Sequence, residues 1–435
     1  MSTSRVEGGF EVSVQVVGNE RAARGVTRGA WLVWGVGAAC YFVALFHRAS
    51  LGVAAPDALV RFSAGPGVLA LFSALQFGVY LVLQVPSGLL ADRLGPRRVI
   101  TGGVVALAVG SAVFAVSGSV LGGMTGRVLI GIGDAFMFTN VLRLAAVWFP
   151  VGRYGRVAAW TGLIGGLGQV LSTVPLTSAL RGWGWAPTFL GAAGVTAVLA
   201  LVAAGVIRDR PAGAITEVPG GEREPIGRTL RVVVAQRGTR RSFWVHFVLL
   251  SQFLALTTLW GAPWLTGAQG VGAGEVGQLL LVAVAGFIAG SLVASQWIAG
   301  RPRRRERCTL GMSVLVVLVW ALLVGWPGVL PGPLLVVVPA LLGLAGGAAM
   351  LAFDGAREAN AVHRSGAASG VVNMGGFLAA VLVQVLVGAV LEVVSSLPAA
   401  EAYRWAFVPV VVLLAVGTAG QWWCRQRVEP VPRRG

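Results

Sequence analysis

Long apolar stretches recur along the whole chain. Twelve of them run for about 20 residues, and none alternates between apolar and polar positions. A helix of about 20 apolar residues crosses the hydrocarbon core of a bilayer, whereas a strand of a membrane barrel alternates. Backbone groups inside a bilayer must pair within the chain, so the pattern predicts an all-α membrane protein with twelve transmembrane helices. The predicted spans are residues 29–51, 66–90, 97–117, 120–147, 155–178, 186–207, 243–266, 274–299, 308–326, 332–354, 366–392 and 402–424.

The longest polar interval, residues 208–242, divides the spans six and six, and it holds eight arginines and three prolines. A weak internal repeat agrees with this division, because residues 131–158 and 343–368 both carry glycines, then an arginine, then a glycine-rich helix. Two such halves are typical of secondary transporters, with the substrate site between them near mid-membrane. The predicted parts are a tail (1–28), a six-helix half (29–207), a linker (208–242), a second six-helix half (243–424) and a tail (425–435).

The charge pattern predicts the orientation of the chain. All 34 basic residues are arginine, the net charge is +17, and most arginines lie in the tails, the linker and the loops on the same side. The segments on the opposite side hold only Arg61 and Arg181. Cytoplasmic loops carry such an excess, so we expect a multi-pass protein of the plasma membrane with both termini cytoplasmic. Arginines at loop ends favour contact with anionic lipids over nucleic-acid binding, which needs a basic face or module.

Several functional classes lack their sequence signals. Cys40, Cys308 and Cys424 are isolated and form no C-x-x-C pair, so metal or disulfide chemistry is not expected. The chain has no lysine, which excludes the nucleotide-binding motif G-x-x-x-x-G-K-[ST]. No grouping of catalytic residue types clusters in any span. We therefore expect no cofactor and no enzymatic activity. A monomer is the expected state of the chain.

The segment from Gly88 to Arg98, between spans 2 and 3, is a short cationic turn with one carboxylate. It resembles the signature loop of the major facilitator superfamily, which needs a glycine, an aspartate–arginine pair, a second glycine and further basic residues. A second signature, an arginine four residues before a glycine, fits Arg127 and Gly131. The resemblance covers all twelve spans. Within the superfamily, Tyr41, Arg48 and residues 52–56 are similar to the branch of phosphate, organic-anion and sugar-acid permeases.

The resemblance implies transport by alternating access and a gating role for this loop. Its gating candidates are Gly88, Asp92, Arg93, Gly95, Arg97 and Arg98. Asp92 is expected to face the N-terminus of the eleventh span, near residues 365–367, because a helix N-terminus favours a carboxylate. This contact would hold the two halves in an outward-open state. The second half departs from the pattern, because its loop at residues 300–305 contains no aspartate.

Three charged residues of the first-half spans are the strongest candidates for function. Arg48 is expected to bind an anion through its guanidinium fork; the alternative is that it reaches back to the membrane surface. Asp134 is expected to carry a coupling proton together with Arg127; the alternative is a structural partner for an arginine of another span. Seven residues place Arg127 and Asp134 on about the same helix face, but roughly 10 Å apart along the axis.

Other polar residues complete the predicted sites. Charges at the inner ends of spans are expected to pair between the halves as a gate, although solvated helix ends would look the same; they are Arg143, Asp354, Arg357 and Glu358. Further residues inside spans are predicted to line the substrate site, although hydrogen bonding between helices is their ordinary role; they are Tyr41, Gln76, Asn140, Trp260, Asn373 and Gln384.

The sequence as a whole predicts a secondary active transporter, with proton-coupled uptake of a small organic anion as its leading form. A drug or metabolite exporter is one alternative, although the fifth span lacks the glycine–proline pair that drug-exporting members carry. A membrane sensor that does not transport is the other alternative. Such a sensor would be expected to lose its intramembrane charges, yet Arg48, Arg127 and Asp134 are all present.

Overall fold

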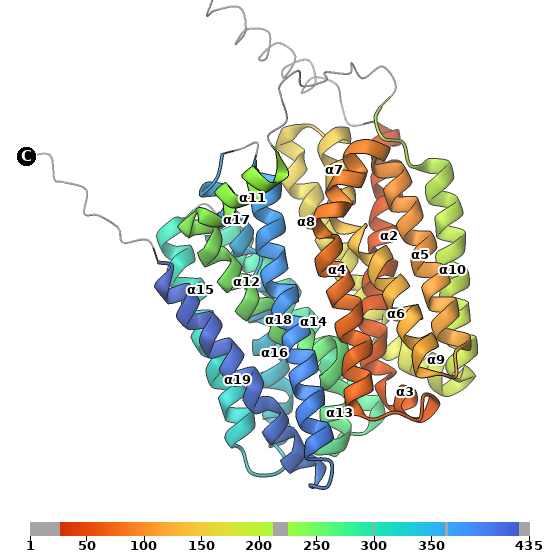
Figure 1. Ribbon diagram of the computed structural model, residues 1–435, viewed down its shortest axis with the longest axis vertical. Coiled ribbons are helices and arrows are strands. Elements are labelled where there is room, and N and C mark those ends of the chain that lie inside the picture. The colour runs from red at the N-terminus through yellow and green to blue at the C-terminus, as the bar shows by residue number, and fades with distance from the viewer. Residues whose placement is uncertain (1–26, 212–224, 299–300, 362–363, 426–435) are drawn as a thin grey trace, which may run out of the picture.

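The computed structural model describes residues 27–211, 225–298, 301–361 and 364–425, and all regular elements within these ranges are helices. Twelve helical segments are long and apolar enough to cross a membrane. Figure 1 shows them as one bundle of roughly parallel rods. The prediction of an all-α membrane protein with twelve spans in two six-helix halves is confirmed.

The first half supplies six spans in chain order. Helix α5 packs between α6 and α10, and α2 packs against α8. The fourth span is interrupted at Phe136 and Met137, so it consists of α6 followed by α7. The helices of this half are α2 (Arg28–Val53), α3 (Ala55–Arg61), α4 (Pro66–Leu94), α5 (Pro96–Val116), α6 (Val120–Ala135), α7 (Phe138–Trp148), α8 (Val151–Leu171), α9 (Val174–Trp183) and α10 (Trp185–Val206).

The second half repeats the arrangement, with α12 against α18 and α14 against α16. Its seventh span contains two π-helical turns around Gly261–Pro263, a type of irregularity that is frequent at functional sites. The elements of this half are α12 (Arg237–Ala255), η1 (Leu256–Trp260), α13 (Gly261–Pro263), η2 (Trp264–Ala268), α14 (Ala273–Val293), η3 (Ala294–Ile298), α15 (Pro302–Gly325), α16 (Gly332–Ala348), α17 (Leu351–Glu358), α18 (Ser365–Val393) and α19 (Ala399–Trp423).

Part of the predicted linker is helical. A separate helix, α11 (Ile226–Ala235), packs on α12 and α18, and α12 already begins at Arg237. Val233 of α11 is fully buried, whereas Arg231 and Val234 beside it are exposed. Mean hydropathy over a window does not detect a helix that is buried on one side only. The arginines of residues 226–242 lower this mean further, so no helix was predicted here. The helix of the seventh span therefore begins six residues before the span that hydropathy predicted.

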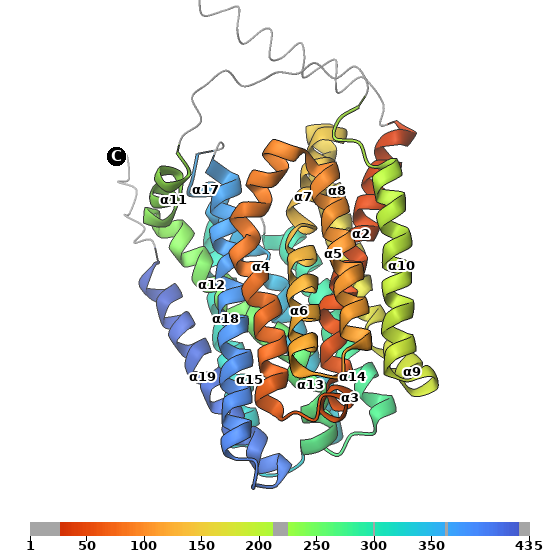
Figure 2. The same ribbon diagram turned by 45° about the vertical axis from the view of Figure 1, so that its right-hand side comes forward.

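The bundle has two ends, which we call the linker end and the distal end. The linker end carries Leu94, Val206 and the start of α12, and both described chain ends lie there (Figures 1 and 2). The distal end carries α3, α9 and the loop between α18 and α19. The halves meet along α4 and α18, between α2 and η1, and between α14 and the α8–α9 span.

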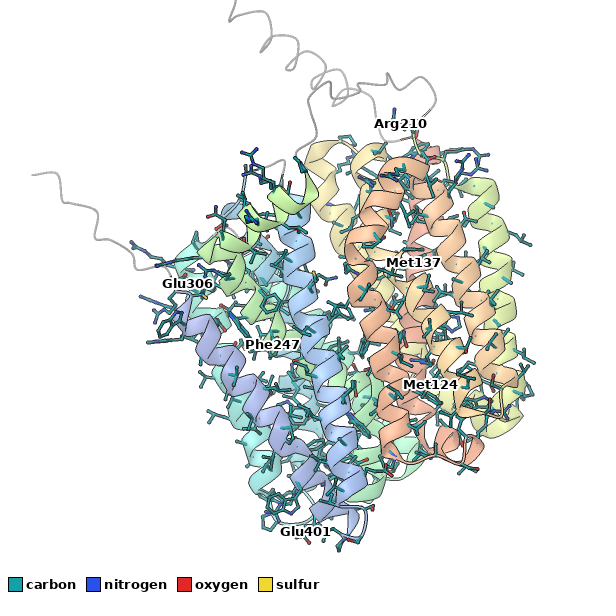
Figure 3. All side chains as sticks on the ribbon, viewed as in Figure 1. Met124, Met137, Arg210, Phe247, Glu306 and Glu401 are labelled. Atoms are coloured by element: carbon teal, nitrogen blue, oxygen red, sulfur yellow. The ribbon has the colours of Figure 1, made fainter. Side chains whose placement is uncertain are left out.

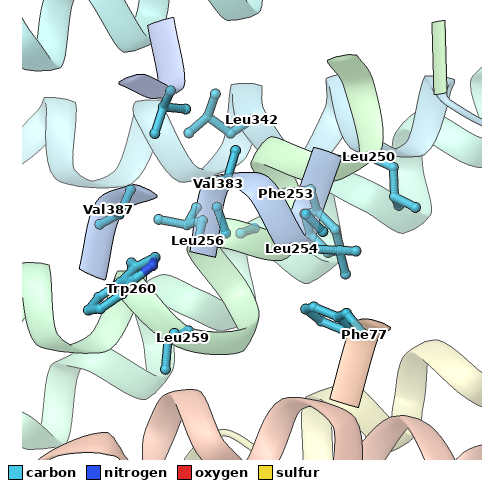
Figure 4. Close-up of a cluster of buried hydrophobic side chains, with 14 of the residues drawn as sticks. Phe77, Leu250, Phe253, Leu254, Leu256, Leu259, Trp260, Leu342, Val383 and Val387 are labelled. Carbon is cyan, nitrogen blue, oxygen red and sulfur yellow. The ribbon is translucent and has the colours of Figure 1, made fainter. Parts of the chain in front are cut away.

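Close packing joins the halves near the middle and at the distal end. An apolar cluster places Phe77 of α4 with Leu254 and Trp260 of the second half (Figure 4). Nearby, α2 crosses η1 so closely that a Cβ at Gly52 would lie 2.6 Å from the carbonyl carbon of Thr258. Only glycine permits this approach of two backbones.

Candidate functional site

The interior of the first half holds a bidentate ion pair between two spans. The Nε and Nη2 groups of Arg48 donate to the two carboxylate oxygens of Asp134 at 2.7 and 2.8 Å. Asp134 is on the last turn of α6, just before the interruption that Met137 marks in Figure 3. The turn between α6 and α7 therefore ends α6 one residue after Asp134, whose carboxylate binds Arg48 of α2. Asp134 is fully buried, while the Arg48 side chain keeps 10% of its surface exposed.

Aromatic rings from both halves flank the Arg48 guanidinium. Its carbon lies 4.9 Å from the ring centre of Tyr80 on α4 and 5.2 Å from that of Phe377 on α18. Tyr80 and Phe377 stack on each other with ring centres 4.1 Å apart. A cation over an aromatic face is attracted by the ring quadrupole. The charge at Arg48 is therefore in contact with the boundary between the halves.

A second buried cation lies in the same interior. Arg127 is 1% exposed; its Nη2 donates to the side-chain oxygen of Gln76 on α4, and its Nη1 lies 3.4 Å from the backbone oxygen of His47. Arg127 and Asp134 do not form a direct ion pair, in agreement with their spacing along α6. The first half therefore brings Arg48, Asp134, Gln76 and Arg127 into one polar group inside an apolar bundle.

Polar side chains also bridge the halves. The side-chain amide of Asn373 on α18 donates to the Gln84 side chain on α4 at 3.1 Å and lies 3.4 Å from the Tyr80 hydroxyl. The Gln169 amide on α8 donates to the Thr257 hydroxyl on η1 at 2.9 Å. Asn373 is thus the predicted substrate-site residue that touches the opposite half through hydrogen bonds.

Three further predicted substrate-site residues have partners within their own halves, whereas Trp260 lies between the halves. Gln384 donates to the Thr258 hydroxyl at 3.2 Å. Asn140 donates to the Ser87 hydroxyl at 3.0 Å and to a backbone oxygen one turn earlier on its own helix. The ring of Tyr41 packs on Phe138, with ring centres 5.3 Å apart. Trp260 is 2% exposed and lies in the apolar cluster between the halves.

The predicted gating loop is a tight turn between α4 and α5. Gly95, with φ +82°, joins the two helices, a backbone conformation that favours glycine. The backbone N–H of Arg97 donates to Asp209 at 2.7 Å, and its guanidinium donates to the backbone oxygen of Ala204 at 2.7 Å. Asp209 therefore supplies a carboxylate to the first turn of α5, and both contacts of Arg97 stay within the first half.

The other residues of the loop have different surroundings. Arg93 and Arg98 are exposed. The Arg143 guanidinium donates to the backbone oxygen of Gly88 at 3.3 Å, which links α7 to α4. Asp92 belongs to the last turn of α4, but its side chain lies outside the described residues, so its predicted contact with α18 stays a prediction.

The acidic cluster of the second half pairs locally. Arg357 donates to Asp354 at 2.8 Å within α17. Glu358 receives two hydrogen bonds from Arg305 of α15, at 2.7 and 2.5 Å. All these partners belong to the second half: the Arg305–Glu358 pair joins α15 to α17, the Arg357–Asp354 pair stays within α17, and neither joins the two halves in this state.

Sequence reasoning did not single out four residues that the structure brings to these sites. They are Tyr80, Asp209, Phe377 and Glu392, an acid of α18 whose carboxylate accepts a hydrogen bond from the backbone N–H of Gly67 at the distal end. For Glu392 a signal was available, because an acid at the end of an apolar span is uncommon. Aromatic residues such as Tyr80 carry no comparable signal in a membrane helix. Among the described residues, no three His, Cys, Asp or Glu side chains gather into a metal site.

Comparison with known proteins agrees with this fold. A "Probable sulfoacetate transporter" of Cupriavidus necator is 28% identical over 183 residues, 41% of this chain and 42% of that relative. A "Probable galactarate/D-glucarate transporter" of Escherichia coli is 24% identical over 433 residues, 89% of this chain and 92% of the relative. The matches to the first relatives span less than half of their length.

The fold itself has solved counterparts. A bacterial homologue of the human lysosomal transporter Spinster, in an inward-facing and unoccupied conformation, superimposes with a TM-score of 0.71 at 16% identity. The superposition covers 92% of this chain and 98% of that one. The sequence profile described as the Major Facilitator Superfamily matches residues 37–384, four fifths of the chain. The chain therefore belongs to the Major Facilitator Superfamily.

Proposed function

We propose that the protein takes up a small organic anion together with protons by alternating access. Arg48 binds the carboxylate or sulfonate of the substrate, and Asp134 carries the coupling proton with Arg127 beside it. The remaining predicted residues Tyr41, Gln76, Asn140, Trp260, Asn373 and Gln384 shape the cavity around the substrate.

The observation that carries this proposal is the occupied guanidinium fork of Arg48. Asp134 supplies the two oxygens that an anionic substrate would supply, so the residue and the substrate compete for the same donors. Protonation of Asp134 removes its negative charge and frees the fork for the substrate. One proton and one monovalent anion then enter the site together, which conserves its net charge.

The accessibility of the Arg48 side chain supports its role as the residue that contacts the anion. Within the described residues, Nη1 of Arg48 has no hydrogen-bond acceptor, and the side chain retains some exposure. An anion can therefore approach Nη1 before the pair with Asp134 opens. Tyr80 and Phe377 transmit the change, because their rings contact the guanidinium from opposite halves.

The distribution of contacts supports an inward-facing state. The described contacts between the halves run from Gln84–Asn373 to the distal end. Toward the linker end, a Cβ on Gly88, Gly366 or Gly370 would meet no atom within 4 Å. The arginine bias puts the linker end in the cytoplasm, where the arginines would also contact anionic lipids.

The relatives support the substrate class. One is named for sulfoacetate and another for galactarate and D-glucarate, all of them small organic anions. An arginine fork recognises the carboxylate that all three compounds share, and it also fits the sulfonate of sulfoacetate. We therefore propose a small carboxylate- or sulfonate-bearing metabolite as the substrate.

Uptake by purified protein in liposomes with an imposed pH gradient tests the proposal. Radiolabelled aliphatic sulfonates and sugar diacids should accumulate when the outside is acidic. Arg48→Gln should abolish binding, whereas Asp134→Asn should still bind and exchange the anion but no longer accumulate it with the pH gradient. Arg404→Gln serves as the control, because Arg404 bonds a backbone oxygen of α15 in the second half.

Two outcomes would contradict the proposal. Accumulation of the anion by Asp134→Asn at the wild-type level would remove Asp134 as the coupling site. Efflux of substrate driven by the opposite pH gradient, without uptake, would indicate an exporter. Correct folding of each variant is checked by gel filtration and thermal unfolding before transport is compared.

A further inference from the structure

Glu392 forms an unusual contact at the distal end of the bundle. It is on the last turn of α18, in the second half, and its carboxylate accepts a hydrogen bond from the backbone N–H of Gly67 in the first half at 3.2 Å. A Cβ at Gly65 would lie 2.7 Å from the same carboxylate. An acidic side chain of one half therefore sits directly on the start of a helix of the other half.

The first turn of α4 leaves one N–H group for Glu392 to bind. Pro66 is the first helical residue and has no N–H. The N–H groups of Val68 and Leu69 both point to the backbone oxygen of Gly65, at 3.2 and 3.3 Å. Gly65, the N-cap residue, has no side chain with which to cap the helix. The Gly67 N–H is the remaining donor, and the carboxylate that accepts it comes from the opposite half.

Close antiparallel packing of α4 on α18 brings Glu392 to Gly67. One turn before Glu392, Gly388 lies against Ala70 so closely that a Cβ there would be 2.3 Å from the Ala70 Cβ. Farther along, the Tyr80–Phe377 stack and the Gln84–Asn373 bond continue the antiparallel pairing of α4 with α18. The pairing brings the C-terminal end of α18 to the N-terminal end of α4.

We propose that Glu392 is a latch that holds the distal end closed. A carboxylate at a helix N-terminus interacts favourably with the partial positive charge of the helix, and this interaction exists only while α4 and α18 are in contact. Among the described side chains Glu392 makes no ion pair. Its electrostatic partner is the partial positive charge at the start of α4. Glu392 is exposed even in the closed contact, so opening of the distal end replaces the hydrogen bond between the halves with hydrogen bonds to water.

The same register agrees with the contact that the family resemblance already implies for Asp92 at the linker end. Pairs such as Gly67–Glu392 and Gln84–Asn373 extrapolate to Asp92 opposite the first residues of α18. Each helix would then place an acid of its last turn on the first turn of the other helix. The two contacts would form in opposite states, one when the distal end closes and the other when the linker end closes.

Thiol labelling in lipid nanodiscs tests the latch without substrate or a pH gradient, so its result is independent of the proposed substrate and coupling. The full chain is used with Cys40, Cys308 and Cys424 replaced by alanine. Ala70→Cys reports on distal opening, because Ala70 is 2% exposed in the closed contact. Gly88→Cys reports on the linker end. Labelling with a polar maleimide is followed over time.

We expect Glu392→Gln to raise the labelling rate of Ala70→Cys about two- to fivefold, the range for a charge at an exposed helix N-terminus, and to lower that of Gly88→Cys. Gly67→Pro, which removes the donor and leaves the acid, should act in the same direction. Glu401→Gln is the matched control, since Glu401 is an exposed acid of the first turn of α19 at the same end. Equal labelling rates for Glu392→Gln and Glu401→Gln would overturn the latch.

Discussion

At the scale of single residues, the buried pair of Arg48 and Asp134 has the largest expected energetic effect. Removal of one partner from a buried ion pair typically costs about 3–5 kcal/mol, whereas replacement of both by apolar residues is often neutral or stabilising. Arg48→Met and Asp134→Leu should each lower the unfolding temperature in detergent. The double variant should unfold at or above the temperature of either single variant. Two additive losses would contradict the pairing that the structure describes.

The sequence identified these residues but did not pair them. Arg48, Arg127 and Asp134 stand out because charges inside apolar spans are costly. Helix periodicity relates residues of one span, so it predicted that Arg127 and Asp134 are too far apart for a direct ion pair, and none joins them. The Arg48–Asp134 bond joins two spans that are 86 residues apart in sequence, and its geometry depends on how α2 packs against α6. A single sequence contains no information of that kind.

At the scale of elements, hydropathy located the spans because burial in lipid requires long apolar helices. It located interruptions less well. The turn at Phe136 and Met137 and the π-helical turns of the seventh span keep an apolar composition, so no change of pattern marks them. The helix α11 was missed for the opposite reason, because its arginines hide a buried stripe.

The crossing of α2 and η1 gives a prediction at this scale. A Cβ at Gly52 would lie 2.6 Å from backbone atoms of Thr258, which cannot move as a flexible side chain can. Gly52→Val should therefore force the crossing apart and destabilise the closed distal end by about 1–3 kcal/mol, the usual cost of overpacking. The measurement is thermal unfolding together with Ala70→Cys labelling. Gly35→Val is the control, because Gly35 is on the same helix with no atom within 4 Å of its Cβ position.

At the scale of the whole molecule, the two halves contact each other from the middle to the distal end. The Arg48 site is close to the inner limit of these contacts, because Tyr80 and Phe377 meet one turn from the Gln84–Asn373 bond that marks the limit. A substrate that enters from the linker end would therefore reach Arg48 once the Gln84–Asn373 bond lets it pass. Rocking of the halves about this middle region would expose the same arginine to the distal side, as alternating access requires.

A reversible crosslink at the distal end tests this motion. The Cα of Val174 on α9 lies 3.4 Å from the Cβ position of Gly277 on α14, and these helices belong to opposite halves. Disulfides need Cβ atoms about 3.5–4.5 Å apart, so Val174→Cys with Gly277→Cys should form one with little movement. The pair is made in a background without the native cysteines.

Oxidation of this double variant should stop transport, because the distal end can no longer open, and reduction should restore it. Labelling of Gly88→Cys at the linker end should persist in the oxidised protein, since that end stays open. Each single cysteine variant, treated with the same oxidant, controls for damage elsewhere. If the oxidised, crosslinked protein transported as fast as the same variant after reduction of the disulfide, the distal contacts would not need to separate. Transport would then have to proceed without the rocking of the two halves that the packing of α4 on α18 and of α9 on α14 implies.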